Sequence, residues 1–441
     1  MREQNPSSKR YRGFVLFMLT LVYGFNFIDR QIVGILAPFI QADLELSNTQ
    51  LGLLIGFYFA LFYTVIAIPI AWMADRYNRV NILSIALAIW SGFTALTGLA
   101  SNFWQIGLAR MGVGIGEAGG SPPSHSIISD LYAKEERAGA LGIYSMGIPF
   151  GIMAAYFITA SLIGSDANQV NWRRTFVFLG VTGIVLAIAL RLLVREPVRG
   201  AMEPQAPVKV KQSTFKESFK ILLSIPAWWA MCLGIAFGSF VSYSFAAFQT
   251  KYILLLDPDF NFKTAIIVLG IINGTTYAAG SYFGAKAADR WGAQTVRAYG
   301  WIPALGIGIA LPISIASFWI TSVWVHLLLA TFLLFFLGTY LGPSFAIAQT
   351  LAPINMRAMS TALFFFILNM IALGGGPTFA GWLIDIFNAN HDELTAMRYA
   401  MTTTCLVFIP SVLCFLAVAK LLPKDWQIAA KRNAALSKTN F

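Results

Sequence analysis

Four ionisable residues stand inside hydrophobic stretches in the first part of the chain. Asp29 and Arg30 lie in one stretch, and Arg110 and Glu117 lie in another. An ionisable side chain at the centre of a membrane-spanning helix costs about 3 kcal/mol on insertion scales, so such residues are rare and are usually functional. Arg110 and Glu117 are two helical turns apart and therefore share one helix face, about 10 Å apart along the axis.

The two carboxyl groups could carry protons. A carboxylate that exchanges arginine partners between two states can load and release a proton, because burial and a neighbouring cation shift its proton affinity in opposite senses. We assign this role to Glu117, with Asp29 as a second carrier. The permanent charge of Arg30 could hold an anionic headgroup or a carboxylate, with Asn26 and Arg110 as further binding residues. The alternative is a neutralised ion-pair network that only positions the helices.

The composition predicts that membrane-spanning helices hold these residues. The chain has 441 residues, of which 57% are hydrophobic and only 12% are charged, and its mean hydropathy is +0.67. Apolar stretches of about 20 residues recur, each long enough to cross roughly 30 Å of hydrocarbon as a helix. They lack the alternation of barrel strands, so we predict an all-α membrane protein with twelve transmembrane helices. The expected spans are 12–40, 48–73, 80–100, 103–131, 137–163, 172–195, 225–256, 262–287, 297–316, 322–350, 356–388 and 394–422.

Basic residues orient these spans. Because the number of spans is even, both termini lie on one side, and 24 of the 31 Lys and Arg fall on that side. Such a bias identifies the cytoplasmic side. It also explains the net charge of +11 without a nucleic-acid partner. The loops of the opposite side carry only Arg173, Arg174, Lys251, Lys263 and Arg398.

A polar connection divides the chain into two halves of six spans. We expect an N-terminal half over 1–195, a cytoplasmic linker over 196–224 that contains an amphipathic helix, a C-terminal half over 225–422 and a cytoplasmic tail over 423–441. Residues 71–78 (AWMADRYN) recur as residues 285–292 (AKAADRWG), each after the second span of its half. The pair Leu131 and Arg137 recurs as Leu351 and Arg357.

The repeated segment resembles the loop motif of the major facilitator superfamily, G-x-x-x-D-R-x-G-R. Asp75, Arg76 and Arg79 match it, whereas Ala71 and Asn78 replace its glycines. The resemblance implies two parallel halves around a central cavity, with the substrate site near the midplane. It also implies that the motif latches the cytoplasmic side, a gate to which we assign, besides these three residues, Asp130, Arg137, Asp289 and Arg290. The alternative is a solvated turn whose charges only set the topology.

Within the superfamily, the sequence resembles the spinster family of lysolipid and sphingolipid-phosphate transporters, especially its bacterial members. The resemblance rests on residues 26–30 (NFIDR) and on residues 110–118 (RMGVGIGEA), which Pro122, Pro123 and Asp130 follow. It covers about the first 150 residues well and the second half in architecture only. It implies a proton-coupled secondary transporter of a lipid-like, amphipathic substrate, which works by alternating access as a monomer in a bacterial inner membrane.

The C-terminal half carries no ionisable residue near the centre of its spans, but many aromatic residues. An apolar half opposite a charged half suits a substrate with a polar head and a long tail. We therefore expect Tyr243, Phe248 and Phe365 to contact the tail. Aromatic residues that face lipid are equally common, so the alternative is that these side chains face the bilayer.

Other protein classes fit the sequence less well. His125 and Asp130 match the H-x-x-x-x-D pattern of some acyltransferases, but this spacing places them on different helix faces, so we predict no enzyme. No Walker loop is present, and neither a cofactor nor a metal site is expected. Two alternatives stay open: a proton symporter of a small organic anion, and a membrane receptor or scaffold that uses the fold without transport.

Overall fold

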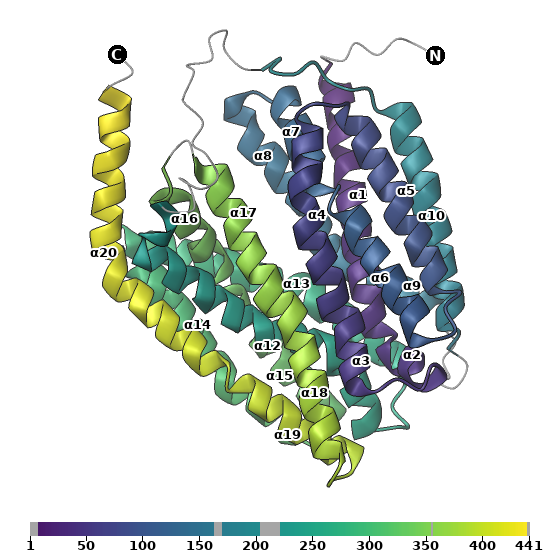
Figure 1. Cartoon of the computed structure of the whole chain (residues 1–441). Helices are drawn as coiled ribbons and strands as arrows, with labels where there is room; N and C mark the ends of the chain where they lie inside the picture. Colours follow the sequence, from purple (N-terminus) through teal and green to yellow (C-terminus); the bar gives the residue numbers. More distant parts are fainter. Residues whose placement is uncertain (1–7, 163–169, 203–220, 354–355, 439–441) are drawn as a thin grey trace. The chain divides into compact units, whose positions relative to one another are not determined.

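The computed structural model describes residues 8–162, 170–202, 221–353 and 356–438 (Figure 1). Within these ranges every regular element is a helix, as predicted. Packing divides the chain into two compact units. The first unit comprises Met1–Ala206, Ala247–Leu254 and Asp259–Gly274, and the second comprises Pro207–Ala246, Leu255–Pro258 and Thr275–Phe441.

The first unit contains the helices of the N-terminal half. Helix α1 packs along α9, and α5 packs along both α6 and α10 (Figure 1). Side-chain caps begin several of these helices: Ser8 accepts from the Tyr11 amide, and Ser47 forms a capping box with Gln50. The helices are α1 (Lys9–Ile35), α2 (Ala37–Asp43), α3 (Asn48–Gly52), the π-helical turn η1 (Leu53–Phe57), α4 (Tyr58–Ala74), α5 (Arg79–Thr97), α6 (Phe103–Glu117), α7 (Ser121–Leu131), α8 (Lys134–Ser145), α9 (Gly147–Leu162) and α10 (Trp172–Leu193).

The second unit contains most of the C-terminal half. Its helices are α12 (Pro226–Leu256), α13 (Phe262–Gly292), α14 (Ala298–Trp319), α15 (Val323–Gly338), α16 (Leu341–Leu351), α17 (Arg357–Leu368), the π-helical segment η4 (Asn369–Gly375), α18 (Gly376–Asn388), α19 (Glu393–Cys405) and α20 (Phe408–Lys438). The C-terminal ends of α12 and the N-terminal part of α13 pack with the first unit. Helix α20 continues far into the predicted tail, and the amphipathic helix predicted in the linker falls mainly outside the described residues.

The twelve predicted spans correspond to these helices. Among the described residues, eleven helices are long and apolar enough to cross a membrane. The twelfth crossing is the predicted fourth span, which the structure divides into α6 and α7. Gly119 and Gly120 lie at this break, and Pro122 and Pro123 begin α7. Each part alone is therefore too short to cross.

Small residues allow the helices of the first unit to approach closely. A Cβ atom on Gly151 of α9 would lie 2.3 Å from the Gly24 carbonyl oxygen of α1, and one on Gly116 of α6 would lie 2.6 Å from Trp90 Cβ of α5. A larger residue at either position would force the helices apart. Gly24, Gly116 and Gly151 therefore serve close helix packing. This packing brings α1, α5 and α6 together around the buried charges.

Candidate functional site

The four membrane charges come together inside the first unit. Arg30 of α1 and Glu117 of α6 form an ion pair, in which Arg30 Nε donates to Glu117 Oε2 at 2.7 Å. Asp29 and Arg110 lie beside this pair, and all four groups interact electrostatically. When all four are ionised, their charges cancel. The cluster therefore joins α1 to α6 without leaving a net charge in the interior.

Aromatic rings surround the arginine of the ion pair. The Arg30 guanidinium carbon lies 5.1, 5.0 and 4.5 Å from the ring centres of Phe27, Phe59 and Tyr63. The face of an aromatic ring attracts a cation, and the attraction is stronger where water is excluded. Asn26, one turn before Arg30, is also buried and interacts with Glu117. These contacts hold the guanidinium near Glu117.

A helical irregularity positions the second arginine. The turn η1 is π-helical, so its carbonyl groups do not all follow the regular α-helical hydrogen-bond pattern. Arg110 Nε donates to the carbonyl oxygen of Leu54 in this turn at 3.4 Å, and its guanidinium lies over the Phe59 ring at 5.1 Å. Arg110 thus reaches a backbone carbonyl rather than forming an ion pair with Glu117, although both lie on α6.

Asp29 is the least compensated member of the cluster. Its side chain is buried, and the Thr94 hydroxyl donates to Oδ2 at 3.2 Å. Oδ1 has no hydrogen-bond partner among the described residues, and neither has Glu117 Oε1. Each carboxyl group therefore keeps one oxygen that could take a proton without breaking a hydrogen bond within the described structure.

The predicted tail-binding residues are divided between the two units. Phe248 is fully buried near the end of α12 that packs with the first unit. In the second unit, Tyr243 interacts with Tyr277 and Tyr340, and Phe365 is 39% exposed and packs against Phe345 and Phe364. Their binding role stays a prediction. No group of three His, Cys, Asp or Glu side chains within the described ranges could hold a metal.

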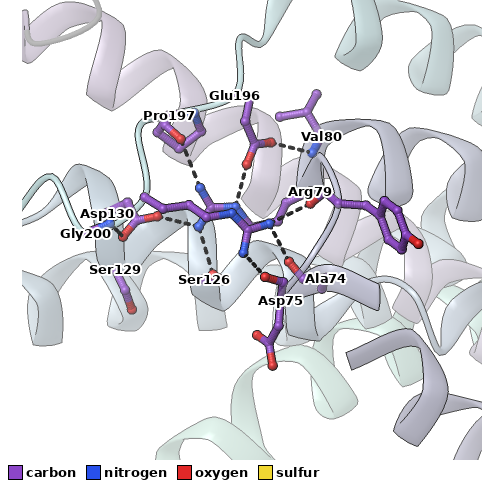
Figure 2. Close-up of polar contacts among 12 residues, drawn as sticks. Ala74, Asp75, Arg79, Val80, Ser126, Ser129, Asp130, Glu196, Pro197 and Gly200 are labelled. Atoms are coloured by element: carbon purple, nitrogen blue, oxygen red, sulfur yellow. Dashed lines mark hydrogen bonds and ion pairs between the residues drawn. The ribbon is translucent and has the colours of Figure 1, made fainter. Parts of the chain in front are cut away.

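The loop motif of the first half builds a second buried polar cluster around Arg79 (Figure 2). Arg79 begins α5 and is only 1% exposed. Its guanidinium forms ion pairs with Asp130 of α7 and with Glu196, the latter at 2.6 Å. It also donates to Ser126 Oγ at 2.8 Å and to the Pro197 carbonyl oxygen at 3.0 Å. We call this set of residues the loop cluster.

The segment after α10 closes the loop cluster from the other side. Arg199 donates to the carbonyl oxygens of Ala74, Asp75 and Tyr77 at the end of α4. Ala74 and Asp75 are labelled in Figure 2. Carbonyl groups at a helix C-terminus have no helical partner, so an arginine stabilises them. The backbone amide of Gly200 donates to Asp130 at 2.9 Å. Three helices and the segment that follows α10 are therefore linked through charged hydrogen bonds.

Sequence reasoning missed two members of this arrangement. Glu196 and Arg199 were counted as the beginning of the linker. The signal was present, because residues 195–199 (REPVR) carry opposite charges directly after the sixth span.

Several predicted gate residues do not join the loop cluster. The side chains of Asp75 and Arg76 are exposed, and Arg76 folds back over the Trp72 ring at 4.0 Å. Arg137 donates to the Ser129 carbonyl oxygen at 2.8 Å, next to Asp130 in the sequence. Of the predicted gate residues in the first half, the structure therefore places Arg79 and Asp130 in direct contact with each other.

The second copy of the motif is arranged differently. Asp289 and Arg290 are both exposed, and Asp289 Oδ1 accepts a hydrogen bond from the Tyr299 hydroxyl at 2.8 Å. Neither forms an ion pair with a residue that the structure describes. The repeat in sequence is therefore not a repeat of the ion-pair cluster.

Lys251 departs from its predicted position. Counted as a cation of an outer loop, it lies instead near the end of α12 and is 6% exposed. Its ammonium group donates to Gln41 Oε1 at 2.8 Å and to Asn48 Oδ1 at 2.6 Å. Gln41 lies in α2 and Asn48 begins α3. Their side-chain oxygens compensate the Lys251 charge where the end of α12 belongs to the first unit.

The comparisons first identify the class of the protein. The model of the Major Facilitator Superfamily matches residues 19–377, so the chain belongs to this superfamily of membrane transporters. An MFS-type efflux pump of Mycolicibacterium smegmatis is 31% identical over 88% of this chain and 88% of its own length. The relatives of this chain are transporters rather than enzymes.

More specific similarities indicate the spinster-like members of the superfamily. Protein spinster homolog 1 of Xenopus tropicalis is 27% identical, with 94% of this chain and 82% of that protein covered. The crystal structure of a bacterial homolog of the human lysosomal transporter spinster, in an inward-facing and unoccupied conformation, has a TM-score of 0.87 and 30% identity. The match covers 95% of this chain and 99% of the chain in that crystal structure. The chain is therefore a spinster-like member of the superfamily, as the motifs predicted.

Proposed function

We propose that the protein is a proton-coupled transporter of an amphipathic, lipid-like substrate with an anionic head. The observation that carries the proposal is the ion pair between the partly buried Arg30 and the buried Glu117, with Asp29 beside it. Ionisable groups inside membrane helices mark proton and substrate pathways. The spinster relatives and the solved bacterial homolog support the lipid-like substrate class, because the resemblance to that family implies it.

Charge balance explains how proton and substrate could be coupled. The cluster is neutral when Asp29, Arg30, Arg110 and Glu117 are all ionised. A proton on Glu117 would weaken its ion pair and leave Arg30 able to hold a phosphate or carboxylate group. Proton and anionic head would then share one arginine. Asp29, with one oxygen without a partner among the described residues, is the second proton carrier.

The loop cluster is proposed as a conformational latch. Arg79, Asp130 and Glu196 link α5, α7 and the segment after α10. Buried charges of this type are strongly coupled, so a state in which they separate must compensate them differently. Asp75, Arg76, Arg137, Asp289 and Arg290 are proposed to take part in other states of the cycle, since they are outside the cluster here.

The uneven distribution of Lys and Arg supports an orientation with both termini in the cytoplasm, and we propose a bacterial inner membrane as the location. Arg110 and Asn26 complete the head site, and Tyr243, Phe248 and Phe365 contact the tail. The protein is proposed to act as a monomer without a cofactor.

The test is transport by the purified protein in proteoliposomes. A fluorescent lysolipid should move faster when a pH gradient is imposed, and Glu117→Gln should remove the response to the gradient. Glu45→Gln serves as a matched control, since it makes the same change at an exposed carboxylate to which no part in the cycle is assigned. A Glu117→Gln variant that keeps the wild-type pH dependence would exclude Glu117 as a proton carrier.

A second candidate is a proton symporter of a small organic anion. The buried Arg110 and the partly buried Arg30 favour it, because they could also bind a carboxylate without an apolar tail. Uptake of small acids with no movement of lysolipid would support this candidate. Lysolipid binding without any movement would instead indicate a receptor or scaffold.

A further inference from the structure

A groove of about 450 Å³ lies between the N-terminal part of α1 and α8, and none of the four membrane charges lines it. Its walls are mainly apolar and come from Gly13, Leu16, Phe17 and Thr20 of α1 and from Gly139, Ala140 and Ile143 of α8. Tyr132 and Glu136 lie at the end nearer the N-terminus. The volume falls in the range of ligand sites, which is roughly 300–1,000 Å³.

Two glycines keep the groove open. A Cβ atom added to Gly13 or to Gly139 would meet no atom within 4 Å, so no neighbouring side chain fills the space above them. Phe17 and Ile143 beside them are 59% and 52% exposed. In a membrane protein, most exposed apolar side chains of spanning helices face hydrocarbon. An acyl chain has the polarity and the elongated shape that this groove accepts.

The charges at the end of the groove indicate the headgroup. Lys9 and Arg10 are exposed, and neither forms an ion pair within the described structure. They precede Gly13 by four and three residues, so helical geometry places them above the groove on the same side of α1. Glu136 is compensated by Arg12, whose Nη1 lies 3.1 Å from Glu136 Oε2. The end of the groove therefore carries two positive charges that form no ion pair with a residue the structure describes.

From this arrangement we propose that the groove binds an anionic glycerophospholipid from the leaflet at the N-terminal side. One acyl chain lies over Gly13 and Gly139, and the phosphate lies against Lys9 and Arg10. The bound lipid fills the space between α1 and α8 and supports α8 in its position. It is a resident lipid of the protein, separate from the transported molecule, and the proposal depends only on the chain spanning a membrane.

The test is photo-crosslinking of the full chain in nanodiscs. A phosphatidylglycerol with a photoactivatable acyl chain should label the peptides of α1 and α8, and phosphatidylcholine with the same chain should label them several-fold less. Gly139→Leu places a side chain in the groove and should lower the labelling several-fold. Gly308→Leu of α14 is the matched control, because a Cβ there also meets no atom within 4 Å, and it should leave the labelling unchanged.

Two further variants separate lipid binding from a folding defect. Gly13→Leu should lower the labelling as Gly139→Leu does, and Lys9→Gln with Arg10→Gln should remove the preference for phosphatidylglycerol while leaving the melting temperature in detergent unchanged. Equal labelling by both lipids, or labelling that Gly139→Leu and Gly13→Leu leave intact, would refute the site. Displacement of the probe by transported lysolipid would also refute it, since the groove would then belong to the transport path.

Discussion

The two copies of the loop motif show how a repeated sequence can serve different physical purposes. In the first copy, Arg79 is buried among Asp130, Glu196 and Ser126. In the second copy, Asp289 and Arg290 are exposed, and no comparable cluster exists among the described residues.

The alignment of the copies explains this difference. The residue equivalent to Arg79 is Ala293, and the second echo of the repeat places Thr350 where Asp130 stands in the first half. Both partners of the central ion pair are therefore absent from the second copy. The same asymmetry holds inside the membrane, where the four buried charges belong to the first half. The second half retains the loop and its charged residues Asp289 and Arg290. These charges are sufficient to orient the chain in the membrane, but they do not form a buried cluster.

The largest effect is expected from the membrane ion pair. Arg30→Met leaves Glu117 buried without its partner, which should abolish transport and lower the free energy of unfolding by roughly 3–5 kcal/mol. Arg30→Met combined with Glu117→Gln removes both charges and should recover much of the lost stability. Thermal unfolding in detergent measures both effects. A double variant as unstable as the single one would show that the contact is not a coupled pair.

The next effect tests the two motif copies against each other. Arg79→Ala leaves Asp130 and Glu196 without a cation at a partly hydrated position, so it should lower the free energy of unfolding by about 2–3 kcal/mol. Arg290→Ala makes the same change at an exposed residue and should alter it by less than about 0.5 kcal/mol. Chemical denaturation of both variants provides the measurement. Equal losses of stability in the two variants would contradict the structural difference between the two motif copies.

A smaller effect is expected at the buried lysine of the second half. Lys251→Ala removes charged hydrogen bonds to Gln41 and Asn48 and should lower the free energy of unfolding by about 1.5–3 kcal/mol. Lys263→Ala, at an exposed position near the start of α13, is the matched control. If the two variants melt at the same temperature, the contacts of Lys251 do not help to hold the end of α12 on the first unit.

The smallest effect concerns helix caps. In the first half, Asn78, Asn102 and Asn171 cap helices and do not titrate, whereas Asp392 caps α19 in the second half. Hydrogen bonds from Thr395 hold the pKa of Asp392 below its ordinary value.

The sign of the pH dependence follows from this lowered pKa. The stability that the Asp392 cap contributes is fully present above the pKa that Asp392 has in the unfolded chain. It is lost as the pH falls through the pKa that Asp392 has in the folded protein. Below about pH 4 the wild type should therefore lose more stability than Asp392→Asn, whose amide still accepts the bond. Melting temperatures measured between neutral and acidic pH test this, and parallel curves would exclude a titrating cap.

The fold could be predicted from the sequence because the sequence signals for it are local. Stretches of apolar residues, helix caps and the repeated loop each depend on residues close in the chain, so the spans and the two halves could be predicted. Sequence reasoning also identified the ionisable residues of the site, since Asp29, Arg30, Arg110 and Glu117 interrupt apolar stretches. It missed Glu196 and Arg199, because a charge just beyond a span has the same local pattern as a linker residue. Nor does a local pattern show that the ring of His326 is buried against Phe245 and Phe318.

The sequence by itself determined that this chain crosses a membrane twelve times, that its halves are related and that one half carries the membrane charges. Only the tertiary structure decided that Glu117 pairs with Arg30, which is 87 residues away, rather than with Arg110 on its own helix. It also decided that Lys251 is buried and that Arg79 is surrounded by acids from two distant segments. Hydropathy acts on each segment separately, whereas ion pairing depends on which helix faces meet, and these faces are set by packing across the whole unit.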